Sequence, residues 1–150
     1  MSPSYWGPAT WNFFHTLAAK VKDEEYPTIG PQIFSLIRDI CSNLPCPDCS
    51  EHAKRFVSNV NISTLKTKQD LINVLYVFHS VVNKRKGKPV YKFENINSYN
   101  NNNIIEAFNN FSKVYNTNGN MRLMAEAFHR RRTLFNVKNW VMQNYSKFNA

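Results

Sequence analysis

The chain has 150 residues, of which 43% are hydrophobic and 14% aromatic, and 19 basic against 10 acidic side chains give a net charge of +9. This length predicts one globular domain with its own hydrophobic core, and the composition excludes an intrinsically disordered chain. No run of about 18 apolar residues is present and the N-terminus lacks the charged-then-apolar order of a signal peptide, so we expect neither a membrane span nor a secretory route.

Helical periodicity dominates the first third of the chain. Apolar residues recur every three or four positions over 8–22, which predicts a first helix with Pro8 in its first turn. The segment 23–31 holds two prolines and a glycine and is predicted to be a loop. An apolar stripe over 33–44 then predicts a second helix that ends near Asn43.

Further helices are predicted along the rest of the chain. A short one begins at or just after Pro47, and a strongly periodic one covers 68–85. The polar segment 93–103 is predicted to be a linker, and a weaker fifth helix follows it. This fifth helix carries Ile104, Ile105, Phe108 and Phe111. The last helix is predicted over about 121–145.

These elements predict an all-α fold, because no alternating strand pattern and no internal repeat accompany the helices. We expect a four-helix bundle with an additional C-terminal helical region. The predicted core covers 1–95, an Asn-rich linker and short helix over 96–118 belong to the same domain, and a basic C-terminal helix covers 119–150.

The C-terminal helix is predicted to have an apolar stripe interrupted by basic residues. We expect this stripe to pack on the bundle itself or on a second chain, with Arg130 and Arg132 at a solvent-exposed rim that attracts acidic substrate segments. The stripe consists of Leu123, Met124, Ala127, Phe128, Arg131, Leu134, Phe135, Lys138 and Val141.

The stretch SNLPCPDCSEH places Cys46 and Cys49 two residues apart, in a chain whose third cysteine is Cys41. Such a pair can be half of a zinc site, a redox-active dithiol, or two inert thiols. A zinc ion needs two more ligands, and no second Cys-x-x-Cys or close histidine pair supplies them. Cys49 falls in the first turn of the predicted third helix, where free N–H groups and the macrodipole favour the thiolate. We therefore favour a redox pair, with the other two interpretations left open.

The third cysteine has a different sequence context. Cys41 falls in the apolar stripe of the predicted second helix. Because a free cysteine behaves as a small hydrophobic residue, we expect Cys41 to be buried by packing, with a redox role as the alternative.

Three separated stretches match one pattern, in the order WGPATWNFFHTLAA, LPCPDCSEH and FHSVVNKRKGKP. The match spans about Tyr5 to Tyr91 and resembles the flavin-linked sulfhydryl oxidases of the Erv/ALR family, in particular the short members found in large DNA viruses. The residues that carry the resemblance are Gly7, Trp11, His15, Cys46, Cys49, His52, His79, Asn83, Gly87, Lys88 and Pro89.

The resemblance implies a thiol oxidase that holds FAD beside the Cys-x-x-Cys pair, uses no metal and forms a homodimer. Its partners would be thiol-containing protein substrates and dioxygen, with Cys46 attacked by the substrate, Cys49 facing the flavin and hydrogen peroxide as the second product. We expect neither a membrane span nor a nucleic-acid partner. We expect a cytoplasmic location, which for a viral protein would be the host cytoplasm or the virion. The cofactor-binding residues would be Gly7, Trp11, His15, Cys49, His52, His79, Asn83 and Lys88.

The chain departs from the family pattern in several places. Tyr76 and Phe93 stand where the family commonly has a structural disulfide, and we expect an aromatic contact in its place. Ser80 replaces an asparagine, Pro8 stands where an arginine is frequent, and no cysteine follows Cys49 to form a second, shuttle pair.

Two functions of another class stay open on the sequence alone. A non-enzymatic helical module would use Arg130, Arg131 and Arg132 to bind RNA or an acidic protein and would need no flavin. A zinc-stabilised structural domain would lose its fold to chelators. A yellow purified protein would favour the oxidase over both.

Overall fold

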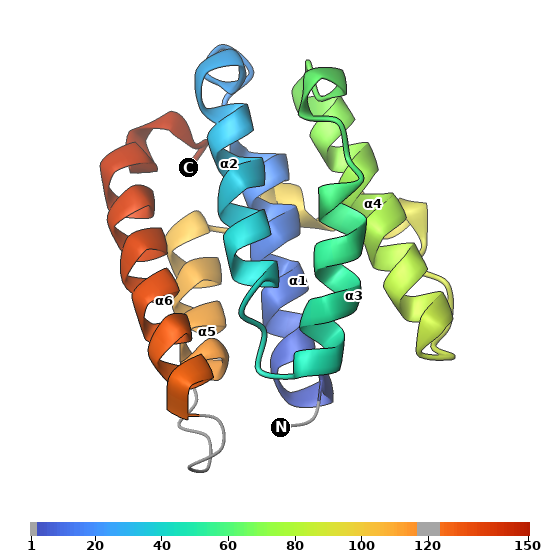
Figure 1. The fold of residues 1–150 in the computed structure, drawn as a ribbon. Helices are drawn as coiled ribbons and strands as arrows, with labels where there is room; N and C mark the ends of the chain where they lie inside the picture. The colour runs from blue at the N-terminus through green and yellow to red at the C-terminus, as the bar shows by residue number, and fades with distance from the viewer. Residues whose placement is uncertain (1–2, 117–123) are drawn as a thin grey trace.

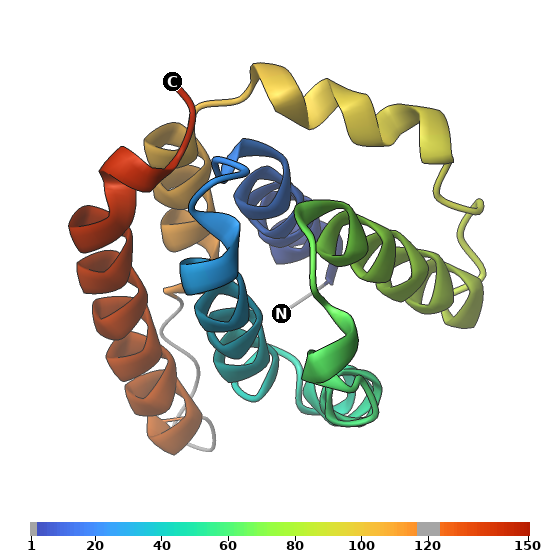
Figure 2. The ribbon, with the colours of Figure 1, turned by 90° about the horizontal axis from the view of Figure 1, so that it is seen from above.

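The computed structural model describes residues 3–116 and 124–150, which form helices joined by short connections (Figure 1). The helices are α1 (Pro3–Lys20), α2 (Tyr26–Cys41), α3 (Pro47–Ser58), η1 (Ile62–Thr64), α4 (Lys68–Arg85), η2 (Phe93–Asn101), α5 (Ile104–Tyr115), α6 (Met124–Asn144) and η4 (Tyr145–Lys147). In the view from above, α1 lies between α4 and α5 while η2 crosses its end (Figure 2). The all-α prediction is confirmed. Among the described helices, none combines the length and the apolar character that crossing a membrane requires.

Two helices begin earlier than the prolines in the sequence predict. α1 starts at Pro3, so that Pro8 lies inside the helix rather than in its first turn. α2 starts at Tyr26 and includes Pro31, so most of the predicted loop over 23–31 is helical. Tertiary packing explains the second difference, because Tyr26 is buried against Gly30 and its hydroxyl donates to the Leu65 carbonyl at 3.0 Å. Burial of this turn outweighs the proline signal.

α3 and α4 begin where the sequence predicts, because their caps are local. Thr67 and Asp70 form a capping box at the start of α4. At its other end, the N–H of Gly87 donates to the Lys84 carbonyl at 3.2 Å and that of Lys88 to the Asn83 carbonyl at 2.9 Å. These bonds form a Schellman motif, which requires the positive φ of 69° that Gly87 adopts.

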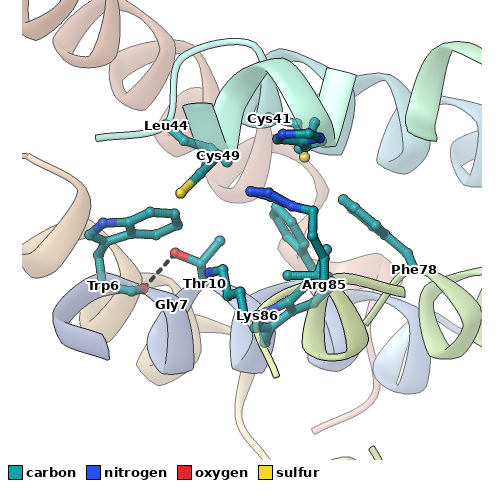
Figure 3. Close-up of a pocket in the computed structure, with 14 residues that line it drawn as sticks. Trp6, Gly7, Thr10, Cys41, Leu44, Cys49, Phe78, Arg85 and Lys86 are labelled. Atoms are coloured by element: carbon teal, nitrogen blue, oxygen red, sulfur yellow. Dashed lines mark hydrogen bonds between the residues drawn. The ribbon is translucent and has the colours of Figure 1, made fainter. Parts of the chain in front are cut away.

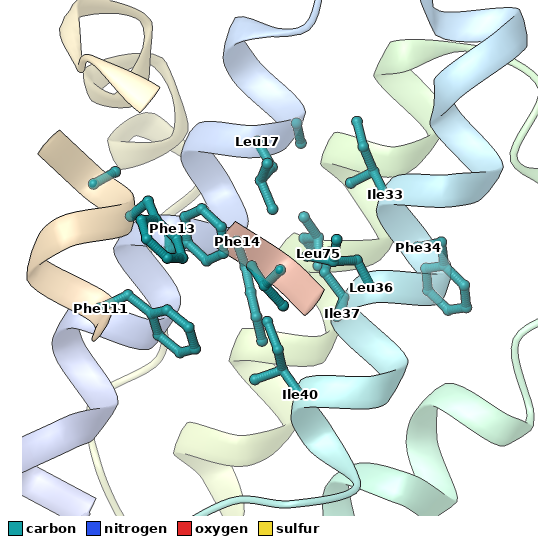
Figure 4. Packing of buried hydrophobic residues seen from close by; sticks show 14 of the residues in the cluster. Phe13, Phe14, Leu17, Ile33, Phe34, Leu36, Ile37, Ile40, Leu75 and Phe111 are labelled. Atoms are coloured by element: carbon teal, nitrogen blue, oxygen red, sulfur yellow. The ribbon is translucent and has the colours of Figure 1, made fainter. Parts of the chain in front are cut away.

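The hydrophobic core is built around α1 (Figure 4). Phe13 and Leu17 are fully buried, and the Phe13 ring stacks on Phe111 of α5 with 5.0 Å between centroids. The helix α5, expected to be weak, therefore supplies core residues. The predicted linker before it is also different: most of 93–103 forms the 3-10 helix η2, which packs on α1 and buries Ile96.

α6 packs on the bundle, against α2 and α5, through Ala127 and Val141 of the predicted stripe and through Val137, which the prediction did not include. The rest of the predicted stripe is only partly correct. Phe128, Arg131, Phe135 and Lys138 are exposed, since one face of α6 alone meets the bundle. Leu123 and the side chain of Met124 lie outside the described residues.

The prediction for the rim of α6 holds for one arginine and fails for the other. Arg132 is exposed, but Arg130 is 2% exposed and lies in the packed face, beside Tyr115 and Glu126. Its position follows from helical geometry, because Arg130 is one turn from both Ala127 and Leu134 and shares their face.

Candidate active site

The Cys-x-x-Cys pair lies where the short loop after α2 meets α3, with Cys46 at the end of the loop and Cys49 in the first turn of the helix. Pro45 and Pro47 flank Cys46, which adopts an extended backbone and is the N-cap of α3. Cys46 and Cys49 form a disulfide with 5.2 Å between their Cα atoms. The Cys49 N–H also donates to the Cys46 sulfur at 3.2 Å. The pair is therefore held at a helix N-terminus, and both residues are half-buried.

One side of this pair opens into a hollow that we call the Cys49 pocket (Figure 3). Figure 3 shows the Cys49 sulfur directed toward Trp6 across the pocket. Cys46 is not among the lining residues, so the two sulfurs have different surroundings. The pocket is lined by Trp6, Gly7, Thr10, Trp11, Phe14, Cys41, Leu44, Cys49, His52, Ala53, Phe78, Val82, Arg85 and Lys86.

A second hollow, the His79 pocket, adjoins the first. It is lined by Pro3, Gly7, Pro8, Trp11, His79, Asn83, Lys86, Lys88 and Tyr99. Gly7, Trp11 and Lys86 line both hollows, so the two are neighbours on either side of these residues. A Cβ atom added at Gly7 would meet no atom within 4 Å, which means that this glycine faces open space.

An aromatic stack forms one wall of the His79 pocket. The Trp11 ring lies parallel to that of His79, with 4.1 Å between centroids and 4° between planes. Tyr91 stacks with His79 at 4.1 Å. His15 is joined to this stack through a hydrogen bond of 2.9 Å between its Nε2 and His79 Nδ1. The stack fixes the orientation of His79 from three directions.

Nearby, Tyr76 and Phe93 are in edge-to-face contact at 5.2 Å. This confirms the aromatic contact predicted where the family commonly has a disulfide. No comparable contact compensates for Ser80, which stands where the family has an asparagine. The buried Ser80 hydroxyl has no hydrogen-bond partner among the described residues.

Burial keeps both imidazoles of the pair neutral at pH 7. It lowers the pKa of His15 to about 3, with the neighbouring His79 adding to the effect. Burial also lowers the pKa of His79 to about 4, helped by the positive charges of Lys88 and Lys86. One ring then donates the proton of their hydrogen bond and the other accepts it. The pKa of Lys86 is itself lowered by burial and by Lys88 and Arg85, so the site concentrates positive charge.

Cys41 forms part of the wall of the Cys49 pocket. It is a free thiol that is 1% exposed, and burial raises its pKa. The predicted burial of Cys41 is therefore confirmed. A buried neutral thiol is also a poor nucleophile.

The residues predicted from the sequence come together in this region. Gly7, Trp11, Cys49, His52, His79, Asn83 and Lys88 line one or both hollows, and His15 contacts His79. Asn83 also has a structural contact, since its side chain donates to the Pro89 carbonyl at 3.3 Å. Their roles toward a cofactor stay predictions. No group of three histidine, cysteine or acidic side chains within 3–116 and 124–150 is placed to hold a metal ion.

Several lining residues were missed in the sequence. Three of them lie on the face of α1 that also carries the predicted residues Gly7 and Trp11. They recur at a spacing of four, which could have identified them: Trp6, Thr10 and Phe14. Lys86 is the C-cap of α4 and follows the predicted residue Asn83 by three positions, so spacing could have identified it too. Tyr99 gave no such signal, because the 3-10 helix η2 brings it to the site.

Comparison with known proteins identifies the class to which this fold and site belong. The Erv1 / Alr family model matches residues 8–102, which run from within α1 through α4 and η2 and include most of the residues that line the two hollows, and the chain belongs to this family.

Similar proteins occur in viruses and plants. Protein 347L of Invertebrate iridescent virus 6, named as a candidate FAD-linked sulfhydryl oxidase, is 30% identical over 96 residues, which are 60% of this chain and 86% of that protein. The FAD-linked sulfhydryl oxidase ERV1 of Oryza sativa subsp. japonica is 32% identical over 92 residues, covering 61% of this chain and 47% of that protein. Among solved structures no significant match was found.

Proposed function

We propose that this chain is an FAD-linked sulfhydryl oxidase that forms disulfides in substrate thiols at Cys46–Cys49 and delivers the electrons to dioxygen. The observation that carries the proposal is the position of the disulfide. Cys49 lines a pocket with aromatic walls and a basic rim, while Cys46 lies outside that pocket. A pair arranged in this way can exchange with a substrate on one side and with a cofactor on the other.

The residues around the two hollows fit FAD in their chemistry. FAD has two ring systems joined by a pyrophosphate, and the hollows offer aromatic surfaces, Trp6, Trp11 and Phe78 in one and Trp11 and Tyr99 in the other. Lys86, which lines both, and Lys88 supply positive charge suited to phosphate. Gly7 keeps the space between the hollows open, because a side chain there would project into it.

The thiol chemistry follows from the disulfide. A substrate thiolate attacks the Cys46 sulfur, the Cys46–Cys49 bond breaks and Cys49 leaves as a thiolate. A second substrate thiolate then attacks the mixed disulfide, which releases the oxidised substrate and a Cys46 thiolate. Two substrate thiols have lost two electrons and two protons, and the pair is reduced. FAD, when bound, accepts those two electrons and passes them to dioxygen, which is reduced to hydrogen peroxide.

The structure supports this division of roles between the two cysteines. Cys46 is the N-cap of α3, where the helix N–H groups, that of Cys49 first among them, favour negative charge on its sulfur. That favours Cys46 as leaving group when the mixed disulfide is resolved. Cys49 faces the pocket, so its thiolate is the sulfur placed toward a bound cofactor.

The test is oxygen uptake with dithiothreitol by the purified yellow protein. Cys46→Ser and Cys49→Ser should each lower turnover by more than about a thousandfold while they retain flavin absorbance near ~450 nm, because each lacks one half of the disulfide. Ser58→Ala at the exposed end of α3 is the control and should keep wild-type turnover. A colourless protein without oxygen uptake would refute the proposal and favour the basic binding module. The homodimer and the cytoplasmic or virion location stay predictions.

A further inference from the structure

A groove runs beside the active-site loop, and Leu44 lines both this groove and the Cys49 pocket. One wall contains Pro45 and Pro47, the two neighbours of Cys46 in sequence. The opposite wall contains Glu126 and Arg130 of α6. This second wall lies outside residues 8–102, which match the family model, so it belongs to the part of the chain that the match does not cover.

The groove continues along the two helices that meet there. A larger hollow between α2 and α6 shares Ser42 and Asn43 with the one beside Cys46, so the two are contiguous. Its far end lies between Gln32 and Trp140, which are joined by a hydrogen bond of 2.9 Å. Ser42, the C-cap of α2, follows Gln32 by ten positions, a distance of about 15 Å at about 1.5 Å per residue. We call the whole feature the α2–α6 groove.

Polar groups in this groove have unused hydrogen-bonding capacity. Within the described part of the chain, neither the Asp39 carboxylate, the Arg132 guanidinium nor the Asn136 amide takes part in a hydrogen bond or an ion pair. Asp39 lies on α2, and Arg132 and Asn136 lie on α6, so both walls present such groups. A ligand with alternating donors and acceptors would satisfy them.

We propose that the α2–α6 groove binds, in extended conformation, the segment of a protein substrate that flanks its reactive cysteine. An extended chain offers free N–H and C=O groups to both walls, whereas the surface of a helix, in a second copy of this protein for example, has its backbone groups already paired. At about 3.3 Å per residue, four or five residues span the stretch of the groove between Gln32 and Ser42. The proposal rests on the proposed function, because the cysteine beside this segment must reach Cys46.

Peptide length provides the first test. Polar peptides of two, four, six and eight residues, with one cysteine at either end, would be oxidised by the full-length protein alongside dithiothreitol. In one of the two orientations, kcat/KM should rise by about tenfold between two and six residues and then level off, because about five residues fill the stretch between Gln32 and Ser42. Equal kcat/KM at all lengths in both orientations would overturn the proposal.

Two variants on α6 provide the matched comparison. Asn136 and Asn139 are both exposed, but Asn136 lines the groove and Asn139 does not. Asn136→Tyr should lower kcat/KM for the eight-residue peptide by about fivefold through KM, with dithiothreitol turnover unchanged, while Asn139→Tyr changes neither. Ser35→Tyr, which blocks the groove from α2, should repeat the effect.

The outcomes separate the groove from the proposed function. Absence of dithiothreitol oxidation in the wild type would refute the oxidase itself. Normal dithiothreitol oxidation with equal peptide kinetics in Asn136→Tyr and Asn139→Tyr would leave the oxidase intact and overturn the groove. A dimer seen by light scattering in the wild type and lost in Asn136→Tyr, without a change in peptide kinetics, would show an interface between copies instead.

Discussion

The two long helices α1 and α6 have opposite relations to the rest of the molecule. α1 contacts α2, α4, α5 and η2, and every residue from Phe13 to Lys20 is buried. α6 contacts α2 and α5 along one narrow face and exposes Phe135 at 65%. α1 carries core residues on one side and site residues on the other, so it couples stability to function. α6 adds a wall to the molecule and leaves most of its surface free.

The sharpest test of this contrast substitutes one phenylalanine on each helix. Phe13→Ala on α1 should lower the free energy of unfolding by about 3–5 kcal/mol, because Phe13 is fully buried and stacks on Phe111. Phe135→Ala on α6 should change it by less than about 0.5 kcal/mol. Urea unfolding of both variants measures the difference, and a loss above that limit for Phe135→Ala would mean that its face is covered in solution.

The site-facing side of the bundle can be separated from its structural side on α4. His79→Ala and Asn83→Ala should purify with less FAD than wild type, since both residues line the His79 pocket. At about 100 times Kd, bound FAD would contribute about 2.7 kcal/mol to stability, and these variants should lose most of it. Asn73→Ala, at an exposed position on the same helix, should keep full yellow colour. Flavin absorbance per mole of protein and melting with added FAD are the measurements. Wild-type occupancy in His79→Ala would contradict its assignment.

The buried histidine pair predicts a pH dependence of stability for the FAD-free protein. The pKa of His79 falls from 6.5 unfolded to about 4 when folded, and that of His15 to about 3. Between these values the unfolded state binds more protons, so stability is complete above pH 6.5 and is lost as the pH falls toward 4. Each imidazole contributes a slope of at most about 1.4 kcal/mol per pH unit. In the double variant His15→Gln, His79→Gln, the free energy of unfolding, measured by urea from pH 7 to 5, should depend less on pH than in the wild type. His129→Gln, exposed on α6, should keep the wild-type dependence.

The smallest expected effect is that of Gly7→Ala, which should raise the stability of the FAD-free protein and lower its retention of FAD. Gly7 lies within α1 with no positive φ, and a Cβ atom would meet nothing within 4 Å. Gly7→Ala should therefore stabilise the FAD-free protein by up to about 1 kcal/mol through helix propensity. It should also weaken FAD retention, because the added methyl enters the space between the two pockets. Thermal melts with and without FAD test both signs, and equal FAD retention would show that Gly7 does not face the cofactor.

The sequence alone determined the helical class, the site motifs and the start of α3 and α4. These features depend on local chemistry. Cys46 caps α3 within its own turn, and the Thr67 capping box and the Gly87 turn bound α4 without help from distant residues. The three motif stretches also predicted residues that line the two pockets. This was possible because binding a ligand requires particular residue types, which can be recognised in the sequence before their positions in space are known.

Only the tertiary structure decided which surfaces are covered. Periodicity predicts that a helix has an apolar side, but α6 has two such rows, and its neighbours α2 and α5 select the one with Val137 and Val141. The same packing buries Arg130. Elsewhere, contacts with Gly30 and Leu65 make Tyr26 part of α2, and packing on α1 turns a predicted linker into η2. The α2–α6 groove likewise exists only once these two helices lie together, because its walls come from segments about 90 residues apart, such as Asn43 and Thr133. Burial is a property of pairs of elements, and a single periodic segment does not contain it.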